Sequence, residues 1–245
     1  MAGRLETKVA VITGGASGIG KIMAQSFIDE GARVIIADIS GREEEAAAQL
    51  GSSARSFSAD VSRSDDVKAM LDYAVASFGK LDILCNNAGL DGAQAPLADY
   101  DEEEFDRVIA VNLRGVFLGM RHAIPLMRAN GGAIVNTASI AGSVVMPQMP
   151  AYCAAKAGVM QITKVAAVEC APFGIQVNTI CPGVIQTPMV AELPRAFIAD
   201  LEKATPAGRI AQPQEIANLA LFLSSGEAPF LTGCSINIDG GYTLL

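Results

Sequence analysis

The sequence predicts an α/β fold in which one parallel sheet is covered by helices on both faces. Short apolar runs alternate with helical patterns along the chain, an order that favours parallel strands joined by right-handed crossovers. A glycine-rich turn joins the first apolar run to the first helical pattern, and the second apolar run ends in an acid. No linker or low-complexity tract interrupts the pattern, so we expect one domain over residues 1–245.

The composition argues against several classes of function. Of 245 residues, 51% are hydrophobic and 18% are charged, which supplies ample material for a large buried core. The net charge of −8 argues against nucleic-acid partners, which need clustered Lys and Arg. No apolar run reaches the ~20 residues of a membrane span, and no signal-peptide stretch precedes the first strand. We therefore expect a cytoplasmic protein with no membrane partner.

Cysteine and histidine offer little for metal or hydrolytic chemistry. The five cysteines are odd in number and scattered, so they fit neither a disulfide framework nor a zinc spacing. We expect buried thiols in a reducing compartment and no metal site. The single histidine, His122, lies within a helical pattern, which argues against a serine-hydrolase triad at Ser139. We interpret His122 as a structural or surface residue.

A glycine-rich turn follows the first strand, Val9–Ile12. Its sequence is Thr13-Gly-Gly-Ala-Ser-Gly-Ile-Gly20, and the helix after it is expected to end near Gly31. Glycines let the backbone approach a pyrophosphate, whose charge rests on the helix N-terminus. A dinucleotide site also requires an acid about 20 residues further on, at the end of the second strand. Asp38 ends the run Arg33–Asp38, so the sequence favours a doubly wound Rossmann-type fold.

The same turn also resembles a nucleotide triphosphate loop. Gly15-x-x-x-x-Gly20-Lys21 matches most of that pattern. Ile22, however, stands where the loop requires a Ser or Thr hydroxyl to hold magnesium. The kinase or ATPase interpretation is therefore disfavoured.

The later elements continue the alternation of strands and helices. The expected strands are 54–58, 81–85, 133–139, 176–181 and 235–239, and the expected helices are 65–78, 99–130, 152–173 and 214–225. The segment 189–209 contains Pro194 and Pro206 and has mixed helical character. We interpret this segment as a substrate lid.

One helix carries a polar residue on an apolar face. Asp99 and Glu102, three residues apart, predict the start of a helix that ends near Asn130. Asn112 interrupts an apolar stripe formed by Phe105, Val108, Ile109, Val116 and Met120. A buried amide must find partners, so Asn112 either bonds a neighbouring backbone or has a role near an active site.

Tyr152 and Lys156 are four residues apart at the start of a predicted helix, so their side chains share one face. A positive charge beside a phenol lowers the Tyr pKa from about 10, which makes the pair a usable proton donor and acceptor. Ser139 ends an apolar run, so its hydroxyl is expected at a strand's carboxyl end, where ligands of open sheets bind. Such a pair is more often a solvated helix face, but only Tyr152 of the four tyrosines has this partner.

These motifs together resemble the single-domain branch of the short-chain dehydrogenase/reductase family. They occur in the order Thr13-Gly14-x-x-x-Gly18-x-Gly20, Asn86-Asn87-Ala88-Gly89, Ser139, Tyr152-x-x-x-Lys156 and Pro182-Gly183. Each motif is weak alone, but the five in this order and spacing make a specific match over nearly the whole chain. A minor departure is Cys153, which follows the tyrosine where family members often carry serine.

The resemblance implies a catalytic tetrad. Tyr152 would be the general acid/base, Ser139 would polarise the substrate oxygen, and Lys156 would lower the Tyr pKa and bind the nicotinamide ribose. Asn112 would support a water that relays protons to Lys156. The resemblance also implies cofactor contacts from Gly14, Ser17, Gly18, Ile19 and Gly20 at the pyrophosphate, Asp60 and Val61 at adenine, Asn87 at the adenosine ribose, and Ile185 and Thr187 at the carboxamide.

The predicted cofactor is NAD, and the predicted substrate is a largely apolar secondary alcohol or its ketone. The Asp38 carboxylate can accept hydrogen bonds from both ribose hydroxyls but would repel a 2′-phosphate. Arg42 is the nearest competing residue and is expected to face solvent. The residues expected around the substrate include no Arg or Lys; they are Leu90, Ala141, Val144, Met146, Met149, Val184 and Met189.

Two alternative functions remain open, and we expect the chain to form an oligomer. A 3-oxoacyl-(acyl-carrier-protein) reductase is a rival within the family, and a non-catalytic dinucleotide-binding regulatory protein is a rival of another class. We expect a homotetramer, because two long helices carry more apolar and small residues than one sheet can cover. These residues are Val116, Phe117, Ala154, Ala157 and Val165. The last strand and Leu244-Leu245 suggest a second interface.

Overall fold

The computed structural model describes residues 3–191 and 194–245, and it confirms the predicted Rossmann-type α/β fold. Within these residues, seven parallel strands form one sheet in the order β3-β2-β1-β4-β5-β6-β7. The strands are β1 (Val9–Thr13), β2 (Arg33–Asp38), β3 (Ala54–Ser58), β4 (Ile83–Asn86), β5 (Gly132–Thr137), β6 (Ile175–Pro182) and β7 (Ser235–Ile238). The inner strands are nearly continuous in apolar residues because helices cover both of their faces.

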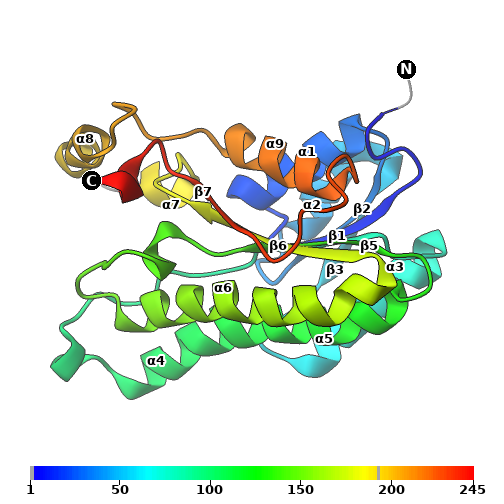
Figure 1. The fold of residues 1–245 in the computed structure, drawn as a ribbon, viewed down its shortest axis with the longest axis horizontal. Coiled ribbons are helices and arrows are strands. Elements are labelled where there is room, and N and C mark those ends of the chain that lie inside the picture. The colour runs from blue at the N-terminus through cyan, green and yellow to red at the C-terminus, as the bar shows by residue number, and fades with distance from the viewer. Residues whose placement is uncertain (1–2, 192–193) are drawn as a thin grey trace.

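Figure 1 shows the helices in two layers, one on each side of the sheet. One face is covered by α1 (Gly18–Asp29), α2 (Glu43–Leu50) and α9 (Pro213–Ser224), and the other by α3 (Ser64–Phe78), α5 (Gly115–Met127) and α6 (Pro150–Cys170). Each layer packs on the sheet through its own cluster of buried side chains. Helix α2 was not predicted from the sequence.

The order of strands reverses between β1 and β4, which pair directly with Ala10 opposite Ile83. In an open α/β sheet, this reversal leaves a crevice at the carboxyl ends of the strands. The turn after β1 and the loop after β4 therefore meet. A Cβ at Gly14 would lie only 2.9 Å from the Ala88 Cα.

The helix predicted from Asp99 to about Asn130 starts later than expected and is interrupted in its middle. It begins with α4 (Glu102–Ile109), and Asp101 caps it by accepting a 2.8 Å hydrogen bond from the Glu104 amide. Asp99 lies instead in a short 3₁₀ turn. A π-helical turn, residues 110–114, separates α4 from α5 and contains Asn112. Such widened turns interrupt the regular helical repeat and recur at functional sites.

The predicted lid, residues 189–209, includes residues 192–193, which lie outside the described residues. Its helical character is confirmed by α7 (Pro188–Ala191) and α8 (Arg195–Ala204). No residue of α8 is buried. In Figure 1, α8 lies beside the C-terminus, at one end of the molecule. Its action as a lid stays a prediction.

Candidate active site

A cleft of about 750 Å³ opens at the carboxyl ends of the central strands. It joins residues predicted to hold a cofactor with residues predicted to act on a substrate. The predicted site residues that line it are Gly14, Ser17, Gly18, Asp38, Asp60, Val61, Asn87, Asn112, Tyr152, Lys156 and Thr187.

The glycine-rich turn forms one wall of the cleft. Gly14 has a φ of 64°, in the left-handed region that favours glycine, and Gly20 has no room for a Cβ because the Gly14 carbonyl oxygen would lie 2.2 Å away. Helix α1 starts at Gly18, and the Ser17 side chain makes no capping hydrogen bond in the described chain. The open amides of the first helical turn can therefore bind an anion.

Asp38 lies at the end of β2 and lines the cleft beside the turn. Its carboxylate accepts hydrogen bonds from the amides of Ala16, at 3.1 Å, and Ser40, at 3.0 Å. Arg42 is exposed, as predicted, but it also lines the cleft. Its Nε donates a long 3.5 Å hydrogen bond to the Ser40 hydroxyl. Asp38 is thus rigidly placed, with a cation on the same wall.

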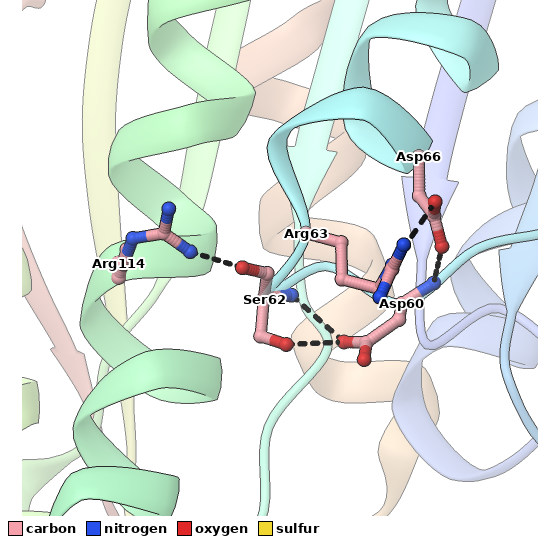
Figure 2. A network of polar contacts seen from close by, with 5 residues as sticks. All are labelled: Asp60, Ser62, Arg63, Asp66 and Arg114. Atoms are coloured by element: carbon pink, nitrogen blue, oxygen red, sulfur yellow. Dashed lines mark hydrogen bonds and ion pairs between the residues drawn. The ribbon is translucent and has the colours of Figure 1, made fainter.

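Figure 2 shows the polar network that shapes the loop after β3. The Asp60 carboxylate accepts hydrogen bonds from the Ser62 amide at 2.9 Å and hydroxyl at 2.7 Å. The Asp60 amide donates to Asp66 at 3.1 Å, and Arg63 pairs with the same carboxylate. Arg114 donates to the Ser62 carbonyl from the π-helical turn. The network ties this wall of the cleft to two helices.

Lys156 is buried at the other end of the cleft, with 4% of its surface exposed. Its Nζ donates a 3.0 Å hydrogen bond to the Thr137 carbonyl and lies 5.5 Å from the Tyr152 ring centroid. Burial lowers the pKa of Lys156 to about 8, while the negative charge of Asp91 acts in the opposite direction. The ammonium is therefore poised to lose its proton in mildly alkaline solution.

Tyr152 is half-buried as a residue, but its phenol lies deep enough for burial to dominate its pKa. Burial raises that pKa above its ordinary value, Asp91 raises it further, and a hydrogen bond with Ser139 lowers it. The direction is opposite to the one predicted from Lys156. Spacing along a helix shows that two side chains share a face, but it does not show how deeply a phenol is buried.

Asn112 is fully buried and makes the structural hydrogen bonds of the simpler interpretation. Its Nδ2 donates to the Leu90 carbonyl at 2.7 Å, and its Oδ1 accepts from the Leu90 amide at 3.1 Å. A Cβ at Gly89 would lie 2.6 Å from the Asn112 Oδ1 and 3.4 Å from the Lys156 Nζ. Asn112 therefore lies beside the lysine, and its part in a proton relay stays a prediction.

Four predicted site residues do not line the cleft. Ser139 ends the strand region beside Tyr152, and its hydroxyl accepts a 3.1 Å hydrogen bond from the Ala141 amide. Gly20 is buried, Ile185 is 4% exposed, and Ile19 packs against the core. The side chains of the two isoleucines thus contribute to folding, which leaves only their backbones to serve a ligand.

The cleft residues that were not predicted from the sequence include Asp91, Arg107 and Thr137. Asp91 follows Gly89 closely in a loop already expected near the substrate, so its charge was a usable signal. Arg107 lies on α4 and is held by Glu104 through two hydrogen bonds of 2.7 and 2.8 Å. The sequence gives no sign that this part of α4 reaches the cleft.

The apolar wall predicted around the substrate is only partly formed by the expected residues. Leu90 lines the cleft, whereas Val184 lines a separate cavity of about 60 Å³. Ala141, Val144, Met146 and Met149 do not line the cleft. Within their segment, the Met149 amide bonds the Met146 carbonyl, so the segment turns back on itself. The Met189 side chain lies outside the described structure.

The described residues contain no group of three or more His, Cys, Asp or Glu side chains arranged to hold a metal ion. None of the helices in residues 3–191 and 194–245 is long and apolar enough to cross a membrane. His122 is structural, as predicted, because its Nε2 lies 2.9 Å from the Ser64 hydroxyl on α3.

Comparisons with known proteins agree with this geometry. A family profile described as Enoyl-(Acyl carrier protein) reductase matches residues 14–243. Cis-4-hydroxycyclohexanecarboxylate dehydrogenase of Sinomonas cyclohexanicum is 43% identical over 96% of this chain and 96% of its own length. Cyclohexanol dehydrogenase of Acinetobacter sp. (strain SE19) is 40% identical over 99% of this chain and 98% of its own length.

A solved structure has the same fold over almost its full length. It is a short-chain type dehydrogenase/reductase from Mycobacterium marinum, 37% identical, with a TM-score of 0.93 over 98% of this chain and 97% of that one. Sequence and structure are thus similar over almost the whole chain. The chain therefore belongs to the short-chain dehydrogenase/reductase family of oxidoreductases.

Proposed function

We propose that the protein is an NAD-dependent enzyme that interconverts a largely apolar secondary alcohol and the matching ketone. The observation that carries the proposal is that Tyr152 and Lys156 meet at one end of a cleft, with Ser139 beside the tyrosine. The other end of the same cleft holds the glycine-rich turn and Asp38. A regulatory protein that only binds a dinucleotide has no need of the tyrosine and lysine. The names of the two dehydrogenase relatives support a cyclic alcohol as substrate.

The residues present fit a dinucleotide. The backbone at Gly14 and Gly20 is too crowded for side chains, so the turn stays open to a pyrophosphate at the start of α1. When bound, the nicotinamide would supply or accept the hydride. The residues that would hold the cofactor are Gly14, Ser17, Gly18, Ile19, Gly20, Asp38, Asp60, Val61, Asn87, Tyr152, Lys156, Ile185 and Thr187.

Asp38 favours NAD over NADP. Its carboxylate is held by the amides of Ala16 and Ser40 and would accept hydrogen bonds from ribose hydroxyls. A 2′-phosphate would meet this negative charge at close range. Arg42 on the same wall acts in the opposite direction, so the preference depends on the balance between one fixed carboxylate and one exposed guanidinium.

The side chains at the catalytic end of the cleft have separate roles in the proposed proton transfer. Tyr152 removes the hydroxyl proton of the alcohol during oxidation and returns a proton to the ketone oxygen during reduction. Ser139, whose hydroxyl lowers the pKa of Tyr152, orients the substrate oxygen. Lys156 would hold the nicotinamide ribose of a bound cofactor, and Asn112 would support a water that exchanges protons with the Lys156 ammonium.

The test is an assay of reduced-nicotinamide absorbance with purified protein, NAD or NADP, and a panel of cyclic and aryl-alkyl alcohols. We expect turnover of several of these alcohols, with a higher kcat/KM for NAD. A higher kcat/KM for NADP would overturn the cofactor assignment. No turnover in either direction would favour the non-catalytic alternative.

The second candidate is a 3-oxoacyl-(acyl-carrier-protein) reductase. It is favoured by the carrier protein in the description of the matching family profile. Asp38 and the net charge of −8 argue against it, because that role usually goes with NADPH and a basic docking patch. A marked preference for 3-oxoacyl thioesters over simple ketones in the same assay would establish this alternative.

The proposal includes a cytoplasmic homotetramer. Phe117 on α5 and Val165 and Val168 on α6 are 46%, 50% and 77% exposed, and the exposed apolar surface fits a second copy. Val116, expected to lie at this interface, is instead 3% exposed in the protomer's own core. The five free cysteines fit a reducing compartment. We assign the substrate lid to the segment 189–209.

A further inference from the structure

A carboxylate lies at the catalytic end of the cleft. Asp91 follows β4 and lines the same cleft as Tyr152 and Lys156. The residue is exposed by surface area, yet its carboxylate is sufficiently enclosed that burial raises its pKa, while Lys156 lowers it. In turn, Asp91 raises the pKa of both Lys156 and Tyr152. Its charge therefore acts where a substrate would react.

Hydrogen bonds on both sides fix the loop that carries Asp91. Before it, the backbone of Leu90 exchanges two hydrogen bonds with the buried Asn112 side chain, at 2.7 and 3.1 Å. After it, the Ala93 amide donates a 2.8 Å hydrogen bond to Glu104 on α4. The carboxylate is thus held at the cleft by its neighbours rather than placed there by a free loop.

Nothing in the described chain neutralises this carboxylate at close range. The ion pairs found among the described residues, with nitrogen and oxygen at most 4.0 Å apart, do not include Asp91. Arg107, the cation on the adjoining helix, is engaged by both oxygens of Glu104. Asp91 therefore adds a negative charge at the substrate end of the cleft, and the Lys156 ammonium is the cation that acts on its pKa.

We propose that Asp91 is a specificity-determining residue that repels carboxylate-bearing substrates and restricts the pocket to uncharged alcohols and ketones. The inference rests on the proposed function. Like charges in a partly enclosed cleft repel more strongly than in water, and selectivity by repulsion leaves the uncharged substrate unaffected. Of the two named relatives, one takes a neutral cyclic alcohol and the other a hydroxy acid.

The experiment uses two substrates with the same ring, cyclohexanol and cis-4-hydroxycyclohexanecarboxylate. The variant D91N keeps the side-chain shape and removes the charge, and D99N removes a charge from an exposed residue that does not line the cleft. In D91N, the ratio of kcat/KM for the hydroxy acid to kcat/KM for cyclohexanol should rise about tenfold. D99N should leave the ratio unchanged. High salt should reduce the discrimination by the natural protein, through screening.

An unchanged ratio in D91N, or an equal rise in D99N, would overturn the inference while leaving the proposed function intact. If the natural protein turns over neither these two alcohols nor any alcohol of the wider panel with NAD or NADP, the proposed function fails instead. The inference is then decided by calorimetry with cyclohexanecarboxylate in the presence of NAD. D91N should bind this anion about tenfold more tightly than the natural protein, and equal affinities would refute the role of Asp91.

Discussion

At the scale of single residues, burial and the negative charge of Asp91 act on the pKa of Tyr152 in the same direction. The phenol is deep enough for burial to raise its pKa, and Asp91 adds to this effect. Lys156 is itself buried and donates its hydrogen bond to the Thr137 carbonyl. The tyrosine therefore starts as a firmly protonated acid, which suits ketone reduction at neutral pH.

Replacing Tyr152 by Phe should reduce kcat about 10²–10⁴-fold, because it removes the group that transfers the proton. The ring remains, so the variant should fold and bind NAD with nearly the same affinity. Steady-state kinetics and a fluorescence titration with NADH would measure the two quantities. Cys153→Ser, at the neighbouring position, is a control that should retain activity. A Tyr152→Phe protein with most of its kcat would refute the mechanism.

The raised pKa of Tyr152 also predicts opposite pH dependence in the two directions. Oxidation needs the deprotonated phenol, so its kcat/KM should rise with pH through the alkaline range. Reduction needs the protonated phenol and should not gain from higher pH. Lys156, with a pKa of about 8, loses its charge in the same range and should weaken cofactor binding there. Profiles between about pH 6 and 10 would test this, and a flat oxidation profile would contradict it.

At the scale of elements, local sequence patterns predicted the positions of the strands more accurately than the ends of the helices. Both Asp99 and Asp101 precede Glu102, and either carboxylate is a plausible cap by type. In the structure Asp101 is the N-cap of the helix, because its side chain accepts a hydrogen bond from the Glu104 amide. The π-helical turn around Asn112 depends on the pairing of Asn112 with Leu90, a contact between distant segments. No local pattern carries that information.

The start of α9 offers a stability test. Glu215 accepts hydrogen bonds from the Gln212 amide and from Arg209, both at 2.8 Å, and its pKa falls to about 2. A lowered pKa means that its contribution is complete above the ordinary value of 4.5 and is lost as pH falls toward about 2. The site is exposed, so Glu215→Gln should lower the unfolding free energy by only about 0.5 kcal/mol at neutral pH.

Urea unfolding at neutral pH and near pH 3 would measure this effect. The difference between the natural protein and Glu215→Gln should shrink at the lower pH. Glu103→Gln, at an exposed position on α4, should show a smaller difference at neutral pH. Equal differences for Glu215→Gln at both pH values would contradict the electrostatic account.

At the scale of the whole molecule, the sequence predicted the sheet, its direction and most of the residues that meet in the cleft. Alternating patterns report which segments become strands, and motif order reports which loops share an edge. The depth of Tyr152 and the approach of Arg107 depend on how α4 and α6 pack. Likewise, Val116 and Phe117 are adjacent in sequence, yet one lies in the core and the other is exposed.

The proposed tetramer can be tested on the outer face of α6. The double substitution Val165→Glu and Val168→Glu places two charges on an exposed apolar surface and should dissociate an interface there. Ala69→Glu on the exposed side of α3 is the control. Light scattering should give about four times 25.4 kDa for the natural protein and the control, and less for the double variant. A monomer mass for the natural protein would refute the assembly.

The pairing of β1 with β4 has a consequence for biosynthesis. Strand β1 is buried along its whole length, and one of its edges is completed only when Ile83 and its neighbours have left the ribosome. Until then, an apolar strand edge in the nascent chain is open to pairing with other chains. High contact order at the centre of the sheet slows closure of that edge. The same arrangement that builds the crevice thus leaves the N-terminal third of the chain with an unpaired strand edge during synthesis.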